Sequence, residues 1–173
     1  MKPTDAIAAP YIHDRVINWS DTDAAQIVYT VRFLDYVMEA VEDWFRAVVG
    51  TSWFEMNVDR GIGTPVVSVN FDFSAPLTPR DALRLTVLVE RAGRASITFK
   101  ILGDRGDGVR SFTTRLICCA VDNKKMKSVD IPVEWRQRIE RYVERCAAVR
   151  NDSTAEQKIA APASTGDARQ AGN

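Results

Sequence analysis

The sequence predicts an α+β domain in which an antiparallel β-sheet wraps around one long central helix. Between Thr30 and about Val49, apolar residues recur every three to four positions, which indicates a helix with one wide buried face. After this stretch, four runs alternate apolar with polar residues, which indicates half-buried strands. A helix followed by a meander of strands buries its apolar face most simply when the sheet curls around it.

The length and composition of the chain fit a single globular domain. The chain has 173 residues, of which 46% are hydrophobic and 27% are charged. A chain of this length supports one core and is too short for two comfortable ones. We expect the domain to occupy residues 1–150. From Asn151 onward small and polar residues dominate, so we predict a disordered tail over residues 151–173.

Charge and cysteine usage exclude several classes of protein. The 23 basic and 23 acidic residues cancel, so no summed positive field would attract nucleic acid or an anionic membrane, and neither partner is expected. No apolar run approaches the roughly 18 residues of a membrane span, and none resembles a signal sequence, so we expect a cytoplasmic protein. With one histidine and no Cys-x-x-Cys spacing, we expect no metal site.

Turn and cap residues delimit the other elements. The alternation over Tyr11–Trp19 predicts a first strand, and Gly50 lies where the long helix should end. The turn before the last strand is predicted at residues 103–108, and Gly93 marks an earlier turn. Pro132 suits the first turn of a C-terminal helix with one apolar face. The four alternating runs are Val67–Phe73, Leu83–Val89, Ile97–Ile101 and Phe112–Ala120.

The segment before the long helix carries the best candidates for chemistry. It reads Ser20-Asp21-Thr22-Asp23-Ala24-Ala25-Gln26, with two acidic residues at a helix start, where free N–H groups attract anions. One interpretation is that these residues only cap the helix. The other is that Asp23 points into a cleft that the first free amides, near Thr30, also face. Those amides would then stabilise an oxyanion forming on a thioester carbonyl.

The same segment resembles a known family. The run Asp21-Thr22-Asp23-Ala24-Ala25-Gln26-Ile27-Val28-Tyr29 is similar to the motif that opens the central helix in 4-hydroxybenzoyl-CoA thioesterases, which have the hot-dog fold. A second run, Gly61-Ile62-Gly63-Thr64-Pro65-Val66-Val67-Ser68, resembles the family stretch that leads into the next strand, but is one residue shorter. The resemblance extends from about Val16 to Trp135.

The resemblance implies a role for eight residues. Asp23 corresponds to the catalytic carboxylate, Thr30 lies at the helix start, and Thr64 belongs to a stretch that lies near the thioester. The remaining residues are expected to bind substrate: Tyr29 and Gln26 in the motif, and Arg94, Ser96 and Lys127 at the CoA nucleotide. Two departures stand out, because the family usually has glycine at the position of Gln26, and many bacterial relatives have histidine at the position of Thr30.

The function that the resemblance implies is hydrolysis of an acyl-CoA thioester. Asp23 would act as a nucleophile or would activate water. An aromatic acyl group of the hydroxybenzoyl or benzoyl type is expected, with a short aliphatic acyl group as the alternative. Coenzyme A is part of the substrate, and no separate cofactor is expected. A non-catalytic acyl-CoA or acyl-carrier binding module of the same fold is a second alternative, and a hot-dog dehydratase, which needs a histidine, is a third.

The remaining polar side chains have simpler interpretations. His13 is expected at the surface or at a strand edge. Cys118 and Cys119 are expected to pack in a strand, since no histidine is available to activate a thiol nucleophile. The uncovered sheet face and strand edges predict self-association, and the family forms dimers with the active site at the subunit interface, and often tetramers. We therefore expect a homodimer or homotetramer.

Overall fold

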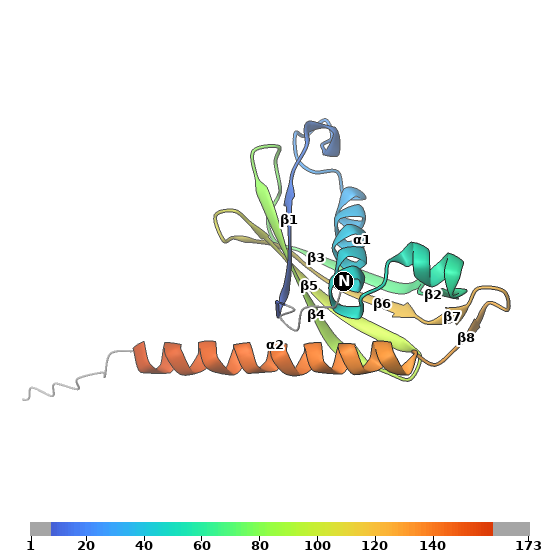
Figure 1. The fold of residues 1–173 in the computed structure, drawn as a ribbon. Coiled ribbons are helices and arrows are strands. Elements are labelled where there is room, and N and C mark those ends of the chain that lie inside the picture. The colour runs from blue at the N-terminus through green and yellow to red at the C-terminus, as the bar shows by residue number, and fades with distance from the viewer. Residues whose placement is uncertain (1–7, 161–173) are drawn as a thin grey trace, which may run out of the picture.

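The structure is a computed structural model that describes residues 8–160, with side chains described from residue 8 to residue 148. Figure 1 shows one antiparallel sheet with α1 against one face and α2 at its end. The described elements are β1 (Tyr11–Val16), η1 (Trp19–Asp21), α1 (Arg32–Trp44), η2 (Phe45–Val49), η3 (Glu55–Asp59), β2 (Ile62–Gly63), β3 (Val66–Phe73), β4 (Ala82–Ala92), β5 (Ser96–Arg105), β6 (Arg110–Cys119), β7 (Val121–Asp122), β8 (Lys127–Ser128) and α2 (Val133–Ala160).

The main sheet contains five strands in the order β1-β4-β5-β6-β3, and every neighbouring pair is antiparallel. The four alternating runs of the sequence form β3, β4, β5 and β6, so those four strands are confirmed. β1 and β3 are the edge strands. A smaller sheet has the order β2-β7-β8, in which β2 precedes β3 in the chain and β7 and β8 follow β6.

Two strand boundaries differ from the prediction. β1 ends at Val16 and not at Trp19, because Asn18 and Asp21 close a 3-10 turn through two hydrogen bonds between them. β5 continues to Arg105, so the turn before β6 begins at Gly106 and not at Gly103. Gly103 lies in the strand because its missing side chain leaves room for the ring of Phe112 on β6.

α1 packs its apolar face on the sheet. The ring of Phe33 lies 5.2 Å from that of Phe112, and the ring of Trp44 lies 4.9 Å from that of Phe99. The helix continues as a π-helical turn through Val49 and ends at Gly50, whose φ of 75° suits glycine at a helix end. α1 itself has 13 residues and is shorter than α2, so the expected single long helix is only partly seen.

α2 closes the end of the core beside β1 and β4. The hydroxyl of Tyr142 donates to the carbonyl of Val87 and accepts from the amide of Tyr11 at 2.9 Å, which ties the helix to both strands. The helix runs on to Ala160, past the point where a tail was expected, because residues 133–160 contain neither glycine nor proline. The rest of the predicted tail, residues 161–173, lies outside the described residues.

Candidate active site

The segment from Asp21 to Tyr29 folds into a short two-stranded loop. Thr22 and Val28 form an antiparallel bridge, and the amide of Asp23 donates to the carbonyl of Ile27 at 3.0 Å. The tip is a tight turn in which the amide of Gln26 donates to the carbonyl of Asp23 at 2.9 Å. Gln26 has a φ of 63°, the left-handed conformation that follows a type I turn in three-residue hairpin loops. This backbone requirement explains why the family usually has glycine at this position.

Asp23 lies at the tip of this loop and is exposed in the single chain. Its Oδ1 accepts a hydrogen bond from the amide of Ala25 at 2.8 Å, which is the turn interaction typical of aspartate. Among the described residues, no group bonds to its Oδ2. The carboxylate therefore has one oxygen that stabilises the turn and one that is available to a substrate or to water.

The first turn of α1 leaves two backbone donors without partners. The carbonyls of residues 29–31 accept from the amides of residues 32–34 at 2.8 to 3.4 Å, which starts the helix. The amides of Thr30 and Val31 donate to no acceptor among the described residues. Both residues are exposed. These N–H groups lie at the positive end of the helix dipole, where an oxyanion is best stabilised.

A cavity of about 350 Å³ borders the same helix start. The amide of Val28 donates to the carbonyl of Leu77 at 2.8 Å, which holds the loop against the chain that follows β3. The rings of Phe33 and Phe73 meet edge to face with centroids 4.9 Å apart in its wall. The residues that line the cavity are Ile27, Val28, Thr30, Phe33, Phe73, Ser74, Ala75, Pro76 and Leu77. The cavity is mainly apolar, and Thr30, one of the two residues with a free amide, lies in its wall.

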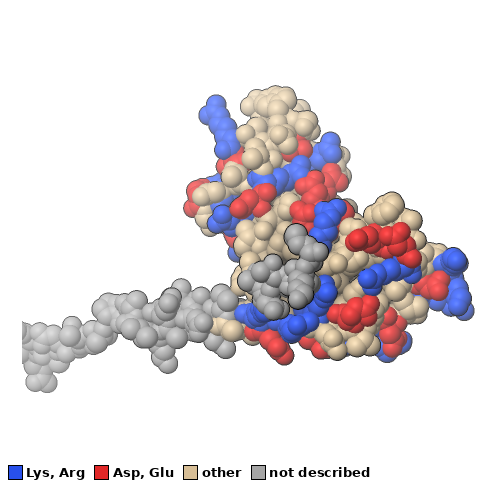
Figure 2. Space-filling view, viewed as in Figure 1, with Lys and Arg blue, Asp and Glu red and all other residues tan. Residues whose placement is uncertain are grey.

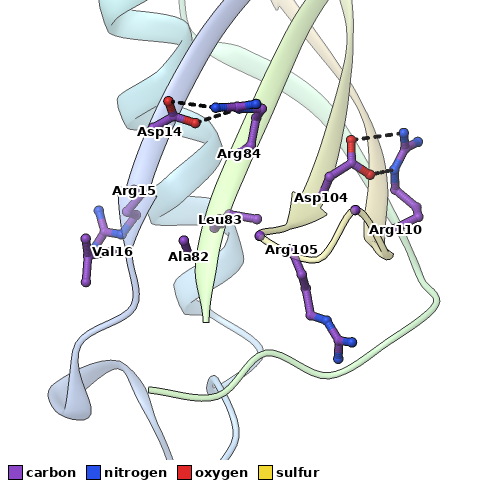
Figure 3. Close-up of a pocket in the computed structure, with 11 residues that line it drawn as sticks. Asp14, Arg15, Val16, Ala82, Leu83, Arg84, Asp104, Arg105 and Arg110 are labelled. Carbon is purple, nitrogen blue, oxygen red and sulfur yellow. Dashed lines mark hydrogen bonds and ion pairs between the residues drawn. The ribbon is translucent and has the colours of Figure 1, made fainter. Parts of the chain in front are cut away.

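A larger cavity of about 650 Å³ lies where β1, β4 and the turn between β5 and β6 meet. Four arginines line it, but each is paired with a carboxylate. Figure 3 shows two of these pairs, Asp14 with Arg84 at 2.8 Å and Asp104 with Arg110 at 2.5 Å. The other two are Arg15 with Glu39 and Arg105 with Asp107. Because no guanidinium charge is left over, this cavity is a weaker candidate for binding an anionic substrate than its size suggests.

The other residues implied by the resemblance gather at the opposite end of the sheet. Thr64 directly follows β2, whose Gly63 pairs with Val121 of β7. Ser96 pairs with Cys119 at the end of β6, two residues before β7 begins. Lys127 pairs with Asp122 across the hairpin of β7 and β8, where Figure 2 shows basic side chains at the tip.

Arg94 lies at the same end, since its carbonyl accepts from the amide of Ile131, and its side chain pairs with Asp130. One chain therefore does not bring Thr64, Arg94, Ser96 and Lys127 together with Asp23. The eight residues of β3 separate Thr64 from the cavity, a length of about 26 Å. Tyr29 and Gln26, by contrast, belong to the loop that carries Asp23 and are exposed.

Sequence reasoning missed a buried polar cluster beside the loop. Asp21 is only 6% exposed, and Arg15 on β1 contacts it from the core side of the strand. In β1 the usual burial of apolar and exposure of polar residues is inverted. Val16 is 70% exposed, while His13 and Arg15 point inward. His13 Nδ1 lies 3.0 Å from Asp43 Oδ2 on α1. The signal in the sequence was Arg15 itself, a charged residue at an inward-facing position six residues before Asp21.

An antiparallel sheet packed on a core helix, with an apolar cavity beside the first free amides of that helix, is the arrangement of a hot-dog domain with room for an acyl group. Residues 17–139 match the family model of the thioesterase-like superfamily, and the chain belongs to this superfamily. It is a thioester hydrolase of the acyl-CoA thioesterase type. These matches establish the superfamily and not its 4-hydroxybenzoyl-CoA branch.

The chain is similar in sequence or in fold to three known proteins. It is 27% identical over 123 residues to a 1,4-dihydroxy-2-naphthoyl-CoA hydrolase of Thermosynechococcus vestitus, covering 70% of this chain and 84% of that protein. The crystal structure of a thioesterase superfamily protein from Jannaschia sp. has a TM-score of 0.71 at 31% identity, covering 81% of this chain and 95% of that one. A 1,4-dihydroxy-2-naphthoyl-CoA thioesterase from Synechocystis has the same fold, with a TM-score of 0.70 at 21% identity, covering 75% of this chain and 94% of that one.

Two kinds of feature are absent from the described residues. Within the part of the chain that the structure describes, no group of three or more histidine, cysteine or acidic side chains could hold a metal ion. No helix among the described residues is both long enough and apolar enough to cross a bilayer.

Proposed function

We propose that the protein hydrolyses an aromatic acyl-CoA to the free acid and coenzyme A. The observation that carries this proposal is the pair of unpartnered amides at Thr30 and Val31 beside an apolar, ring-lined cavity. The acyl group occupies the cavity, and its thioester carbonyl oxygen accepts hydrogen bonds from the two amides. Negative charge develops on this oxygen when the carbonyl carbon is attacked, so the amides stabilise the transition state more than the substrate.

Asp23 supplies the attack on the carbonyl carbon. Its free Oδ2 either removes a proton from a water molecule that attacks the carbonyl, or attacks the carbonyl itself to form an anhydride that water then hydrolyses. In both routes water is consumed, the C–S bond breaks, and the CoA thiolate is released and takes up a proton. No separate cofactor takes part, because coenzyme A arrives as part of the substrate.

The site is completed by a second chain. β3 is an edge strand with unpaired backbone groups, and it carries exposed apolar side chains such as Val67 at 60% and Phe73 at 50%. Such an edge favours pairing with another strand. If two copies of β3 pair antiparallel about a two-fold axis, the start of each strand lies opposite the end of the other. Thr64 of one chain then approaches the cavity of its partner.

This pairing also accounts for the separation of the binding residues. Arg94, Ser96 and Lys127 lie at the same end as Thr64, so the partner brings them toward the outer mouth of the cavity, where the CoA nucleotide would lie. Asp23 is exposed in one chain because the surface it faces belongs to the other. The minimum assembly is thus a homodimer, and two such dimers would form a homotetramer. A cytoplasmic location, where acyl-CoA is made and used, fits this function.

An aromatic acyl group is favoured over a short aliphatic one by the rings of Phe33 and Phe73 in the cavity wall. Two of the similar proteins are named for a bicyclic aromatic substrate, the dihydroxynaphthoyl group. We include hydroxybenzoyl, benzoyl and dihydroxynaphthoyl groups in the proposed class. A short aliphatic acyl group, as in butyryl-CoA, is the alternative substrate.

The decisive experiment measures hydrolysis of a panel of acyl-CoA thioesters by the protein and by Asp23→Asn. The substitution nearly preserves shape and the hydrogen bond from Ala25, but removes both the nucleophile and the base. We expect kcat to fall by about 10²-fold or more, in line with the loss of a positioned general base. Asp35→Asn, an exposed aspartate of α1 paired with Arg32, is the matched control and should keep full activity.

Three results would contradict the proposal. Full turnover by Asp23→Asn would remove Asp23 from the chemistry. Faster turnover of butyryl-CoA than of the aromatic thioesters would give the aliphatic alternative. Turnover of neither group of thioesters would place the acyl group outside both classes.

A further inference from the structure

The first aspartate of the Asp-x-Asp pair has a different environment from the second. Asp21 is buried, while Asp23, two residues on, is exposed. The Oδ2 atom of Asp21 accepts a hydrogen bond from the amide of Asn18 at 3.0 Å and lies 3.6 Å from Nη2 of Arg15. A buried carboxylate is costly unless it is paired in this way. The two aspartates therefore have separate tasks.

Arg15 connects Asp21 to the central helix. Its guanidinium lies 4.1 Å above the ring of Tyr36 and pairs with Glu39 one turn further along α1. Burial, followed by the nearby carboxylate of Asp21, raises the pKa of Tyr36, so its hydroxyl stays neutral. The cluster of Arg15, Asp21, Tyr36 and Glu39 thus links β1, η1 and α1 through charged and aromatic contacts.

The loop is held at two separate places. Its second strand is held by the hydrogen bond from Val28 to the carbonyl of Leu77, which forms part of the cavity wall. Its first strand, which leads into Asp23, has the buried side chain of Asp21 as its side-chain anchor to the core. The carbonyl of Asp21 also accepts from the amide of Tyr29 at 2.9 Å, which couples this anchor to the start of α1.

We propose that Asp21 is a positioning residue, which fixes Asp23 relative to the free amides of Thr30 and Val31 by anchoring the first strand of the loop to Arg15. This inference rests on the function proposed above. Asp21 is not among the residues that line the cavity, so it acts on the reaction through the geometry of the loop. The cavity keeps its own anchor at Leu77.

This arrangement predicts a specific kinetic effect. In Asp21→Asn the side chain still accepts from the Asn18 amide but no longer attracts Arg15, so the strand that carries Asp23 loosens. A displacement of about 1 Å of a reacting group can reduce the rate by up to about 10²-fold. We expect kcat to fall between about 10- and 100-fold, with KM changed less than about 3-fold, because the cavity wall is held independently.

The test compares Asp21→Asn with Arg15→Lys, Asp23→Asn and the control Asp14→Asn. Asp14 also lies on β1 and pairs with Arg84, but on the exposed face of the strand, so its variant should keep both kcat and KM. Arg15→Lys retains a positive charge beside Asp21 but loses the planar contact with Tyr36, so we expect its kcat to lie between that of the unmodified protein and that of Asp21→Asn. Each variant is assayed at a temperature where thermal unfolding shows it to be folded.

The outcomes separate the two proposals. A lowered kcat with preserved KM in Asp21→Asn, and partial retention in Arg15→Lys, support the positioning role. An unchanged kcat in folded Asp21→Asn overturns the positioning role, and so do equal losses in kcat and in 1/KM. If Asp23→Asn is inactive in the same assay, Asp23 keeps its proposed role. Full activity in Asp23→Asn overturns the proposed function first. If Asp21→Asn does not fold, Arg15→Lys and Arg15→Met carry the same test, and unchanged kcat in both overturns the inference.

Discussion

Gln26 occupies a backbone conformation that a side chain resists. Its φ of 63° lies in the left-handed region, where a residue with a Cβ atom is less stable than glycine by about 1–2 kcal/mol. Glycine at this position would lose more conformational freedom on folding, which costs about 0.5–1 kcal/mol. The difference predicts that Gln26→Gly raises the free energy of unfolding by about 0.5–1 kcal/mol. For a chain of this size the corresponding rise in Tm is about 1–4 °C.

The assay is urea unfolding followed by tryptophan fluorescence, with Tm from calorimetry as a second measure. Ala25→Gly is the matched control, because Ala25 belongs to the same turn and is not among the residues with positive φ. It should lower the free energy of unfolding by about 0.5–1 kcal/mol through chain entropy alone. If Gln26→Gly is no more stable than Ala25→Gly, the left-handed turn is not the conformation of the loop in solution, and the geometry that presents Asp23 must be revised.

Two further predictions follow from the core and from the buried aspartate. In Gly103→Ala the new Cβ would lie 2.2 Å from an atom of the Phe112 ring, which cannot retreat because it packs on Phe33, so urea unfolding should show a loss of about 1–3 kcal/mol. Burial alone would raise the pKa of Asp21, but the Asn18 amide, Tyr36 and Arg15 more than offset it and hold the pKa below its ordinary value of 3.8. The ionised form is therefore favoured by folding, so the stability difference between the protein and Asp21→Asn should be constant above about pH 4 and shrink as the pH falls below it. A difference that instead grows toward low pH would contradict the pairing with Arg15.

The strands β4 to β6 and the core helix followed from periodicity because their apolar residues face one core, whereas β3 alternates in sequence but exposes residues such as Val67 in the single chain. Val67–Phe73 and Leu83–Val89 alternate cleanly, and each forms a strand over that span. The turn predicted over residues 103–108 lies at residues 106–108, so its start was wrong: Gly103 was taken as a turn residue, but its role is to leave room for the ring of Phe112. A close contact between two strands does not change the local sequence pattern. The sequence therefore could not distinguish a glycine in a turn from a glycine that leaves room for a ring on the neighbouring strand.

The candidate site was predicted in part, for a similar reason. The motif located the loop and the helix start, because capping residues and acidic residues mark a helix N-terminus in the local sequence. It did not show that Asp21 and Asp23 point to different surroundings, since that depends on Arg15 approaching from β1. Nor did it show that Thr64 and Lys127 lie a strand length from Asp23, which depends on the direction in which β3 crosses the sheet.

Gln26 occupies a position in the turn where the backbone favours glycine. A tight turn of this type needs a residue that accepts positive φ, and glycine meets that need at the lowest cost. A chain that keeps glutamine there carries a backbone cost of about 1–2 kcal/mol, yet the loop retains the bridge at Thr22 and Val28 and the anchor at Asp21. Because those contacts hold both strands of the loop, the turn can keep its geometry without glycine. The exposed amide side chain of Gln26 then lies next to Ile27, a residue of the cavity lining, at a position where glycine has no side chain.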